Sequence, residues 1–237
     1  MNIISIGCLL WTILAYVLAK RVYARFPKFW LNPAITVATV TIVLMIVLGI
    51  SYQTYFADTA WIVELLGPAT VAFAIPIYQY RQLIYRYAAV LAVSIVVGML
   101  VGIASIMVFA RVFKFDTTLT YSLMARSIST PFAIDLAQQI HGSAALVSLF
   151  TLITGVVGMV IGDMVLAWSK IRFHLAHGVA LGNASHGFGT ARASQRHESE
   201  GVIASLTMVL AGLFMVFFGP ALIHLMTAIY PMLFYAI

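Results

Sequence analysis

The feature that most constrains the fold is an apolar segment that occurs twice in this chain. At an offset of 115 residues, 66–78 (LGPATVAFAIPIY) pairs with 181–193 (LGNASHGFGTARA), and four of the thirteen positions are identical. The hydrophobic segments on either side align at the same offset. A repeated membrane segment that is broken by Gly or Pro is typical of transporter substrate sites. The repeat therefore predicts a membrane fold built from two similar halves.

Composition supports a membrane location. Only 8% of the 237 residues are charged, whereas 63% are hydrophobic. A soluble domain carries roughly a quarter charged residues, and apolar runs of this length indicate helices and not a barrel. The net charge of +6 comes from Lys and Arg between apolar runs, as the positive-inside rule expects, so nucleic-acid binding is not indicated. The lone Cys8 excludes an intrachain disulfide.

Each half contains four apolar runs in the same order. If every run crosses the membrane, the halves are parallel repeats. If one run per half re-enters, each half crosses three times and the halves are inverted. The last run is too long for one span, so we expect a break at Gly219-Pro220 and a second short helix over 221–236. The eight runs are 2–19, 33–51, 60–80, 87–110, 117–141, 143–168, 175–192 and 201–236.

The placement of basic residues favours the inverted arrangement. If 60–80 and 175–192 are re-entrant or discontinuous, the basic loops 20–28, 111–116 and 169–174 all face the inside. We therefore predict an all-α polytopic membrane protein of the bacterial plasma (inner) membrane. Six full spans and two broken elements form a single transmembrane domain, 1–237, with inverted repeats 1–115 and 116–237. Both termini are expected outside, with an uncleaved first helix.

The two glycine-containing breaks predict a binding site for an anion. A helix that restarts inside the membrane exposes free N–H groups and the positive end of its dipole. Two such ends near the pseudo-two-fold axis would bind an anion without a metal or a cofactor. The alternative is that these glycines only allow tight helix packing. The candidate substrate-binding residues here are Gly67, Pro68, Ala69, Thr70, Gly182, Asn183 and Ser185.

A second candidate region, 126–135, places an arginine deep in an apolar run. Arg126 is expected near mid-membrane, where an ionisable residue indicates function, and its planar fork suits a carboxylate. Ser127, Ser129 and Thr130 supply hydroxyls, and Pro131 would free a backbone carbonyl. The alternative is a structural ion pair of Arg126 with Asp135 or with Glu64.

The second broken element carries further candidates. His186 either contacts substrate or is a satisfied core histidine, and Arg192 either joins the site or anchors the cytoplasmic edge. Glu64, Asp135 and Asp163 are candidates for proton coupling or for helix pairing. His174, His177 and His197 are interpreted as surface residues, and no metal site is expected. The remaining substrate-binding candidates are Gly187, Gly189 and Thr190.

Three motifs resemble one known family. Leu65–Tyr78 (LLGPATVAFAIPIY), Arg126–Ala133 (RSISTPFA) and Ala184–Ala193 (ASHGFGTARA) are similar to LrgB/CidB motifs, and the resemblance covers nearly the whole chain. Arg126 stands where that family usually has Lys, and His141 stands where it often has Gly.

The resemblance implies two functions. Some members are similar to carriers of small carboxylates, among them the plastidal glycolate/glycerate translocator, in which an LrgA-like half is fused to an LrgB-like half. Others were described as holin/antiholin-like modulators of murein hydrolase activity and autolysis. We expect an elevator-like transporter of pyruvate, glycolate or glycerate, with a small LrgA/CidA-like membrane subunit and a homo-oligomeric assembly. The alternative is a holin-like regulator without a substrate. Enzyme activity is not expected.

Overall fold

The computed structural model describes residues 3–26, 28–72 and 74–234. All regular elements within these residues are helices. The chain divides into two compact units, Met1–Ala69 and Thr70–Ile237, which are considered separately. The predicted repeat boundary at residue 115 lies inside the second unit, between two of its helices.

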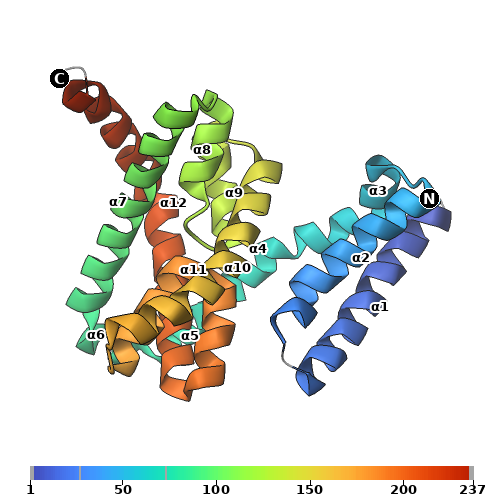
Figure 1. The fold of residues 1–237 in the computed structure, drawn as a ribbon, viewed down its shortest axis with the longest axis horizontal. Helices are drawn as coiled ribbons and strands as arrows, with labels where there is room; N and C mark the ends of the chain where they lie inside the picture. Colours follow the sequence, from blue (N-terminus) through green and yellow to red (C-terminus); the bar gives the residue numbers. More distant parts are fainter. Residues whose placement is uncertain (1–2, 27, 73, 235–237) are drawn as a thin grey trace. The chain divides into compact units, whose positions relative to one another are not determined.

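The first unit consists of three long helices and a short 3-10 turn. α1 (Ile3–Arg25) packs against α2 (Pro33–Leu48) and α3 (Tyr52–Glu64), and η1 (Phe29–Leu31) links the first two (Figure 1). Polar pairs tie these apolar helices together. The Trp11 Nε1 donates to the Thr41 hydroxyl at 3.1 Å, and the Thr12 and Tyr55 hydroxyls lie 3.0 Å apart.

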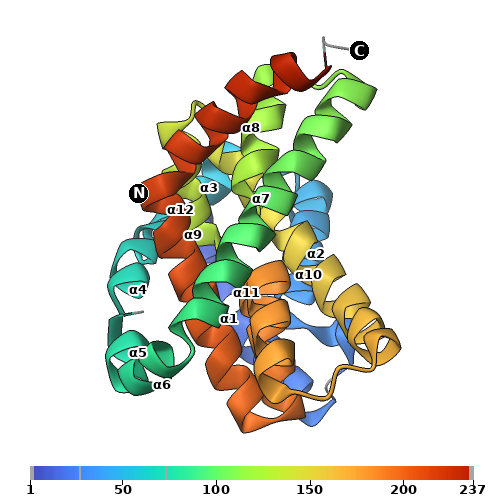
Figure 2. The ribbon, with the colours of Figure 1, turned by 90° about the vertical axis from the view of Figure 1, so that its left-hand side faces the viewer.

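The second unit packs its helices around α12. A core of buried side chains joins α7, α8, α9 and α12, and it includes Met99, Ile103, Met124, Leu136 and Met215. α11 lies against both α10 and α12, as Figure 2 shows. After α4 (Leu66–Ala72), which spans the boundary between the units, the helices are α5 (Ala74–Gln79), α6 (Arg81–Arg86), α7 (Ala88–Phe113), α8 (Thr117–Ala125), α9 (Thr130–Gln139), α10 (Ala144–Ser169), α11 (His174–Arg196) and α12 (Glu198–Phe234).

Four helices of the described chain are long and apolar enough to cross a membrane. They are Ile3–Arg25, Ala88–Phe113, Ala144–Ser169 and Glu198–Ile229, and Pro33–Leu48 is a shorter apolar helix. The prediction of an all-α membrane protein is therefore confirmed at this level. The six-span count, the inverted repeats and the re-entrant elements stay predictions.

The expected interruptions lie at other residues than predicted. Gly67–Thr70 belongs to α4, because the chain turns earlier, at Leu65, and Pro68 then falls in the first turn of the helix. A proline is tolerated there since the first N–H groups have no intrahelical partner. Gly182–Ser185 also lies within α11, and the only non-helical backbone angles inside this helix belong to His186.

The break expected at Gly219-Pro220 is wrong. α12 continues through both residues to Phe234, so the separate helix predicted over 221–236 does not form within the described residues; 235 and 236 lie outside them. Figure 1 shows that the helix bends instead, since its dark red end runs at an angle to its orange beginning. A proline commonly kinks a helix in this way when neighbouring helices pack around it.

Candidate functional site

The backbone of α11 is interrupted at His186. This residue has φ 49° and ψ −124°, a conformation that non-glycine residues rarely adopt. The residue is 3% exposed, and neither ring nitrogen has a hydrogen bond of ordinary geometry to the described residues. Strained backbone with an unpartnered polar side chain is a feature that clusters at functional sites.

Glycines of α10 allow the interruption to lie close to that helix. A Cβ on Gly158 would be 2.5 Å from the Ser185 hydroxyl, and one on Gly155 would be 3.3 Å from the Ser185 carbonyl oxygen and 2.6 Å from the ring of Phe188. Any side chain at either glycine would push the α11 kink away. The absence of side chains at Gly155 and Gly158 therefore lets the α11 kink lie directly against α10.

A second interruption separates α8 from α9. Residues 126–129 are not helical, Arg126 caps the end of α8, and Ser129 precedes α9 with extended backbone angles. Pro131 lies in the first turn of α9, where a proline starts a helix. The prediction that it frees a backbone carbonyl inside a helix is therefore wrong. Arg126 extends to α10, where its Nη1 donates to the Thr154 hydroxyl at 3.2 Å.

The two interruptions face each other. The buried ring of His186 lies beside the backbone of Ser127 and within electrostatic range of the Arg126 guanidinium. α7 contributes two glycines to the same region. A Cβ on Gly102 would be 2.8 Å from the Ser127 hydroxyl, and one on Gly98 would collide with the side-chain nitrogen of Asn183.

A cavity of about 1130 Å³ opens beside these residues. We call the part lined by Arg126, Ser127, Thr154 and Asn183 the polar end. Apart from Ser94 and His174, the rest of the lining is largely apolar and comes mainly from α7 and α11. Asn183 is held by a 3.0 Å hydrogen bond from its side-chain nitrogen to the Ser94 carbonyl. None of the described lining residues is acidic, so Arg126 gives this end of the cavity a positive charge.

Several buried polar atoms around the interruptions have no hydrogen-bond partner of ordinary geometry among the described residues. Burying a hydroxyl, amide or imidazole without a partner costs roughly 1–3 kcal/mol, so native proteins rarely keep such groups together. A concentration of them near a cavity favours a polar ligand. The atoms are the hydroxyls of Ser129, Thr151 and Ser185, the side-chain oxygen of Asn183 and both ring nitrogens of His186. Of these residues, Asn183 lines the cavity and the others lie behind the lining.

Comparison with known proteins gives the family. The model of the LrgB-like family matches residues 12–225. This chain belongs to the LrgB-like family. It is 34% identical to the uncharacterized protein YwbG of Bacillus subtilis over 94% of this chain and 99% of that protein. It is 29% identical to the holin-like protein CidB of Staphylococcus epidermidis over 92% of this chain and 95% of that protein. No solved structure matches.

In this LrgB-like protein, part of the predicted site is brought together. Arg126, Ser127, Ser129, Asn183, Ser185 and His186 lie at or beside the two interruptions, and Thr130 begins α9 next to them. Gly67, Pro68 and Ala69 belong to the other unit, and the side chain of Thr70 lies outside the described ones. Their approach to α11 stays a prediction.

The glycines and the threonine of α11 have structural roles in this LrgB-like protein. A Cβ on Gly182 would collide with the Ala204 backbone of α12, and one on Gly189 would collide with the Leu181 carbonyl, whereas Gly187 faces open space. The Thr190 hydroxyl donates to the His186 carbonyl at 2.8 Å. For Gly182, these contacts agree with the packing alternative, and its role in binding stays a prediction.

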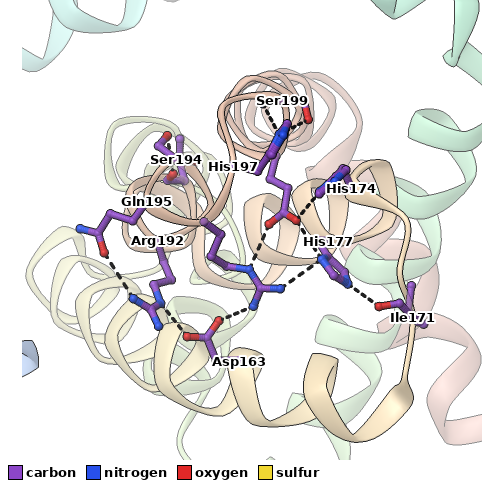
Figure 3. Close-up of polar contacts among 12 residues, drawn as sticks. Asp163, Ile171, His174, His177, Arg192, Ser194, Gln195, His197 and Ser199 are labelled. Carbon is purple, nitrogen blue, oxygen red and sulfur yellow. Dashed lines mark hydrogen bonds and ion pairs between the residues drawn. The ribbon is translucent and has the colours of Figure 1, made fainter.

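Arg192 belongs to an ionic network, which Figure 3 shows. It is not among the residues that line the large cavity. Its Nε donates to Asp163 at 2.6 Å, and Arg196 joins the same carboxylate at 2.9 Å. Asp163 thus links α10 to α11, in agreement with helix pairing. Glu64 and Asp135 are exposed, and no ion pair joins Asp135 to Arg126 within the described residues.

A buried glutamate, which the sequence analysis missed, completes the network. The Glu200 side chain is 3% exposed and lies 2.8 Å from His174 Nδ1, 3.0 Å from His177 Nδ1 and 3.1 Å from Arg196 Nε. His177 is buried, so its interpretation as a surface residue is wrong. The only sequence signal was the four-residue spacing of Arg196 and Glu200, which suits an ion pair across a helix junction.

Proposed function

We propose that this protein transports a small monocarboxylate, of the pyruvate, glycolate or glycerate class, across the bacterial plasma membrane. The observation that carries the proposal is Arg126 at the polar end of the large cavity, with the neutral Thr154 as its hydrogen-bond partner. An arginine at such a position, without a carboxylate partner among the described residues, is suited to bind the carboxylate of a ligand.

The surrounding groups fit the rest of such a substrate. The guanidinium would hold the carboxylate, assisted by the Ser127 hydroxyl and by the N-terminus of α9, whose cap residue Ser129 makes no side-chain cap hydrogen bond. Ser185 and His186 directly follow the lining residue Ala184, and they would contact the 2-oxo or 2-hydroxyl oxygen when the α11 kink opens toward the cavity. An apolar wall beyond the polar end would exclude water from the bound anion.

The finer architecture belongs to the same proposal. We infer an elevator-like mechanism in which inverted repeats 1–115 and 116–237 carry broken elements at 60–80 and 175–192. Both termini are placed outside. A small LrgA/CidA-like membrane subunit is the expected partner, the assembly is expected to be homo-oligomeric, and no enzymatic step is required.

The alternative is a holin-like regulator of autolysis, which the name of the CidB relatives favours. Such a protein would act by assembling in the membrane or by permeabilising it, without saturable transport. It would have no need for an arginine beside a cavity.

Reconstitution in proteoliposomes separates the two functions. We expect saturable uptake of labelled pyruvate, glycolate or glycerate, measured with and without the LrgA/CidA-like subunit, and no leakage of an encapsulated neutral dye. Arg126→Ala should abolish uptake, whereas Lys114→Ala at an exposed helix end should not. Dye leakage without selective uptake in both preparations would favour the holin-like alternative and reject the transporter.

A further inference from the structure

The connection between α10 and α11 joins basic and aromatic residues. Lys170 ends α10 with φ 55° and ψ 20°, and Arg172 follows two residues later. Trp168 and Phe173 flank them and are 85% and 79% exposed. Tryptophan beside basic residues at the end of an apolar helix is typical of the headgroup level of a bilayer.

A small cavity opens at this connection. It has a volume of about 270 Å³, and its polar lining residues are Lys170, Arg172, His177 and Arg196. The apolar lining comes from Leu166, Ala167 and Ile171, and no described lining residue is acidic. Since ligand pockets for drug-sized molecules begin at roughly 300 Å³, this cavity suits a smaller anionic group.

The ionic network leaves two positive charges at the mouth of this cavity. Asp163 and Glu200 are the nearby carboxylates. Asp163 pairs with Arg192 and Arg196, and Glu200 pairs with Arg196. Lys170 and Arg172 make no ion pair within the described part of the chain, so their charges are not offset by a carboxylate.

The cavity wall is fixed before any ligand binds. The ring of His177 contacts the Ile171 carbonyl through Nε2 at 2.7 Å, which holds the connecting loop against α11 (Figure 3). Arg196 is held by Asp163 at 2.9 Å and by Glu200 at 3.1 Å. A preorganised wall lowers the entropic cost of binding.

We propose that this cavity binds a phosphate-bearing anion, supplied by the headgroup of an anionic membrane lipid. Lys170 and Arg172 contact the phosphate, and the apolar wall takes the glycerol and the first part of the acyl chains. Basic recesses between membrane helices are known to bind such headgroups. The site is separate from Arg126 and stands whether the protein is a transporter or a regulator.

Native mass spectrometry of the full-length protein in detergent tests the proposal. Titration with phosphatidylglycerol should give one saturable bound lipid, whereas phosphatidylcholine should bind at least tenfold more weakly. Lys170→Gln and Arg172→Gln should each weaken phosphatidylglycerol binding roughly five-fold, and the double variant about thirty-fold. Arg172→Lys, which keeps the charge, should retain most of the affinity.

Lys114→Gln is the matched control. Lys114 also ends an apolar helix in the left-handed conformation, with φ 53°, but it does not line this cavity. Equal loss in Lys114→Gln and in Lys170→Gln, or equal binding of the two lipids, would overturn the proposal. Competition by millimolar inorganic phosphate would support the anion site and assign its ligand to free phosphate. Thermal unfolding of each variant checks that it is folded.

Discussion

Removing the charge of Arg126 should weaken the binding of substrate and leave the stability of the fold nearly unchanged. In Arg126→Ala the protein loses one hydrogen bond to a neutral hydroxyl, 3.2 Å long, which is worth about 1 kcal/mol of folding free energy. The substitution also removes a partly buried charge that has no carboxylate partner in the described part of the chain, and this offsets the loss. We therefore expect the melting temperature of Arg126→Ala to stay close to that of the wild type.

The effect on substrate affinity should be far larger. Removing one member of a buried charge pair costs about 2–5 kcal/mol, which corresponds to a loss of about 30-fold to about 5,000-fold in affinity for the carboxylate. Arg126→Lys should keep part of the affinity because a point charge replaces the planar fork. Thr154→Val removes the hydrogen-bond partner of Arg126 and should change affinity by about tenfold or less.

Isothermal titration and thermal unfolding in detergent provide the two measurements. A stable Arg126→Ala protein with unchanged pyruvate, glycolate and glycerate affinity would refute the role of Arg126 in binding. A destabilised Arg126→Ala protein that Asp135→Asn rescues would instead favour the structural ion pair, which the exposed position of Asp135 argues against.

Three stability measurements test the local geometry. His141→Gly should raise the free energy of unfolding by about 1 kcal/mol, because this exposed residue has φ 61°, which strains a residue with a side chain but not glycine. An unchanged free energy of unfolding would show that the backbone is not strained there. Gly182→Ala should lower it by about 1–3 kcal/mol through collision with α12, whereas Gly187→Ala, which faces open space, should not. Glu200→Gln should lower it by about 3 kcal/mol, because Arg196 would lose a buried partner; a loss below 1 kcal/mol would show that the network is not stabilising.

Hydropathy predicted the helices well because an apolar run in a membrane protein has few structural options. The run 143–168 matches α10 (Ala144–Ser169), and the run 87–110 matches most of α7 (Ala88–Phe113). Interruptions were predicted less well. Gly182 was chosen because glycine permits irregular backbone, yet packing against α12 keeps it helical and moves the interruption to His186.

The sequence motifs predicted many of the residues at the polar end of the cavity. The other residues that shape it could be recognised only from tertiary contacts. Arg126, Ser127 and Asn183 could be selected because polar residues inside apolar runs are unusual. Gly98 and Gly158 could not be selected, since their importance depends on which side chain of another helix lies opposite. The network around Asp163 and Glu200 was hidden for the same reason, because its members come from three helices (Figure 3).

The unpartnered hydroxyls offer a test of why this polar cluster is present. Ser185 and Thr151 are at most 4% exposed, and their hydroxyls have no hydrogen-bond partner. If the cluster served only packing, Ser185→Ala and Thr151→Val would raise stability at no functional cost, since each replaces a costly buried hydroxyl by an apolar group. If it serves substrate binding, Ser185→Ala should raise the free energy of unfolding by about 1 kcal/mol and also weaken carboxylate uptake several-fold. Thr190→Val, which removes a hydroxyl already bonded to the His186 carbonyl, is the control for a structural effect. Higher stability with unchanged uptake in Ser185→Ala would exclude its hydroxyl from the site.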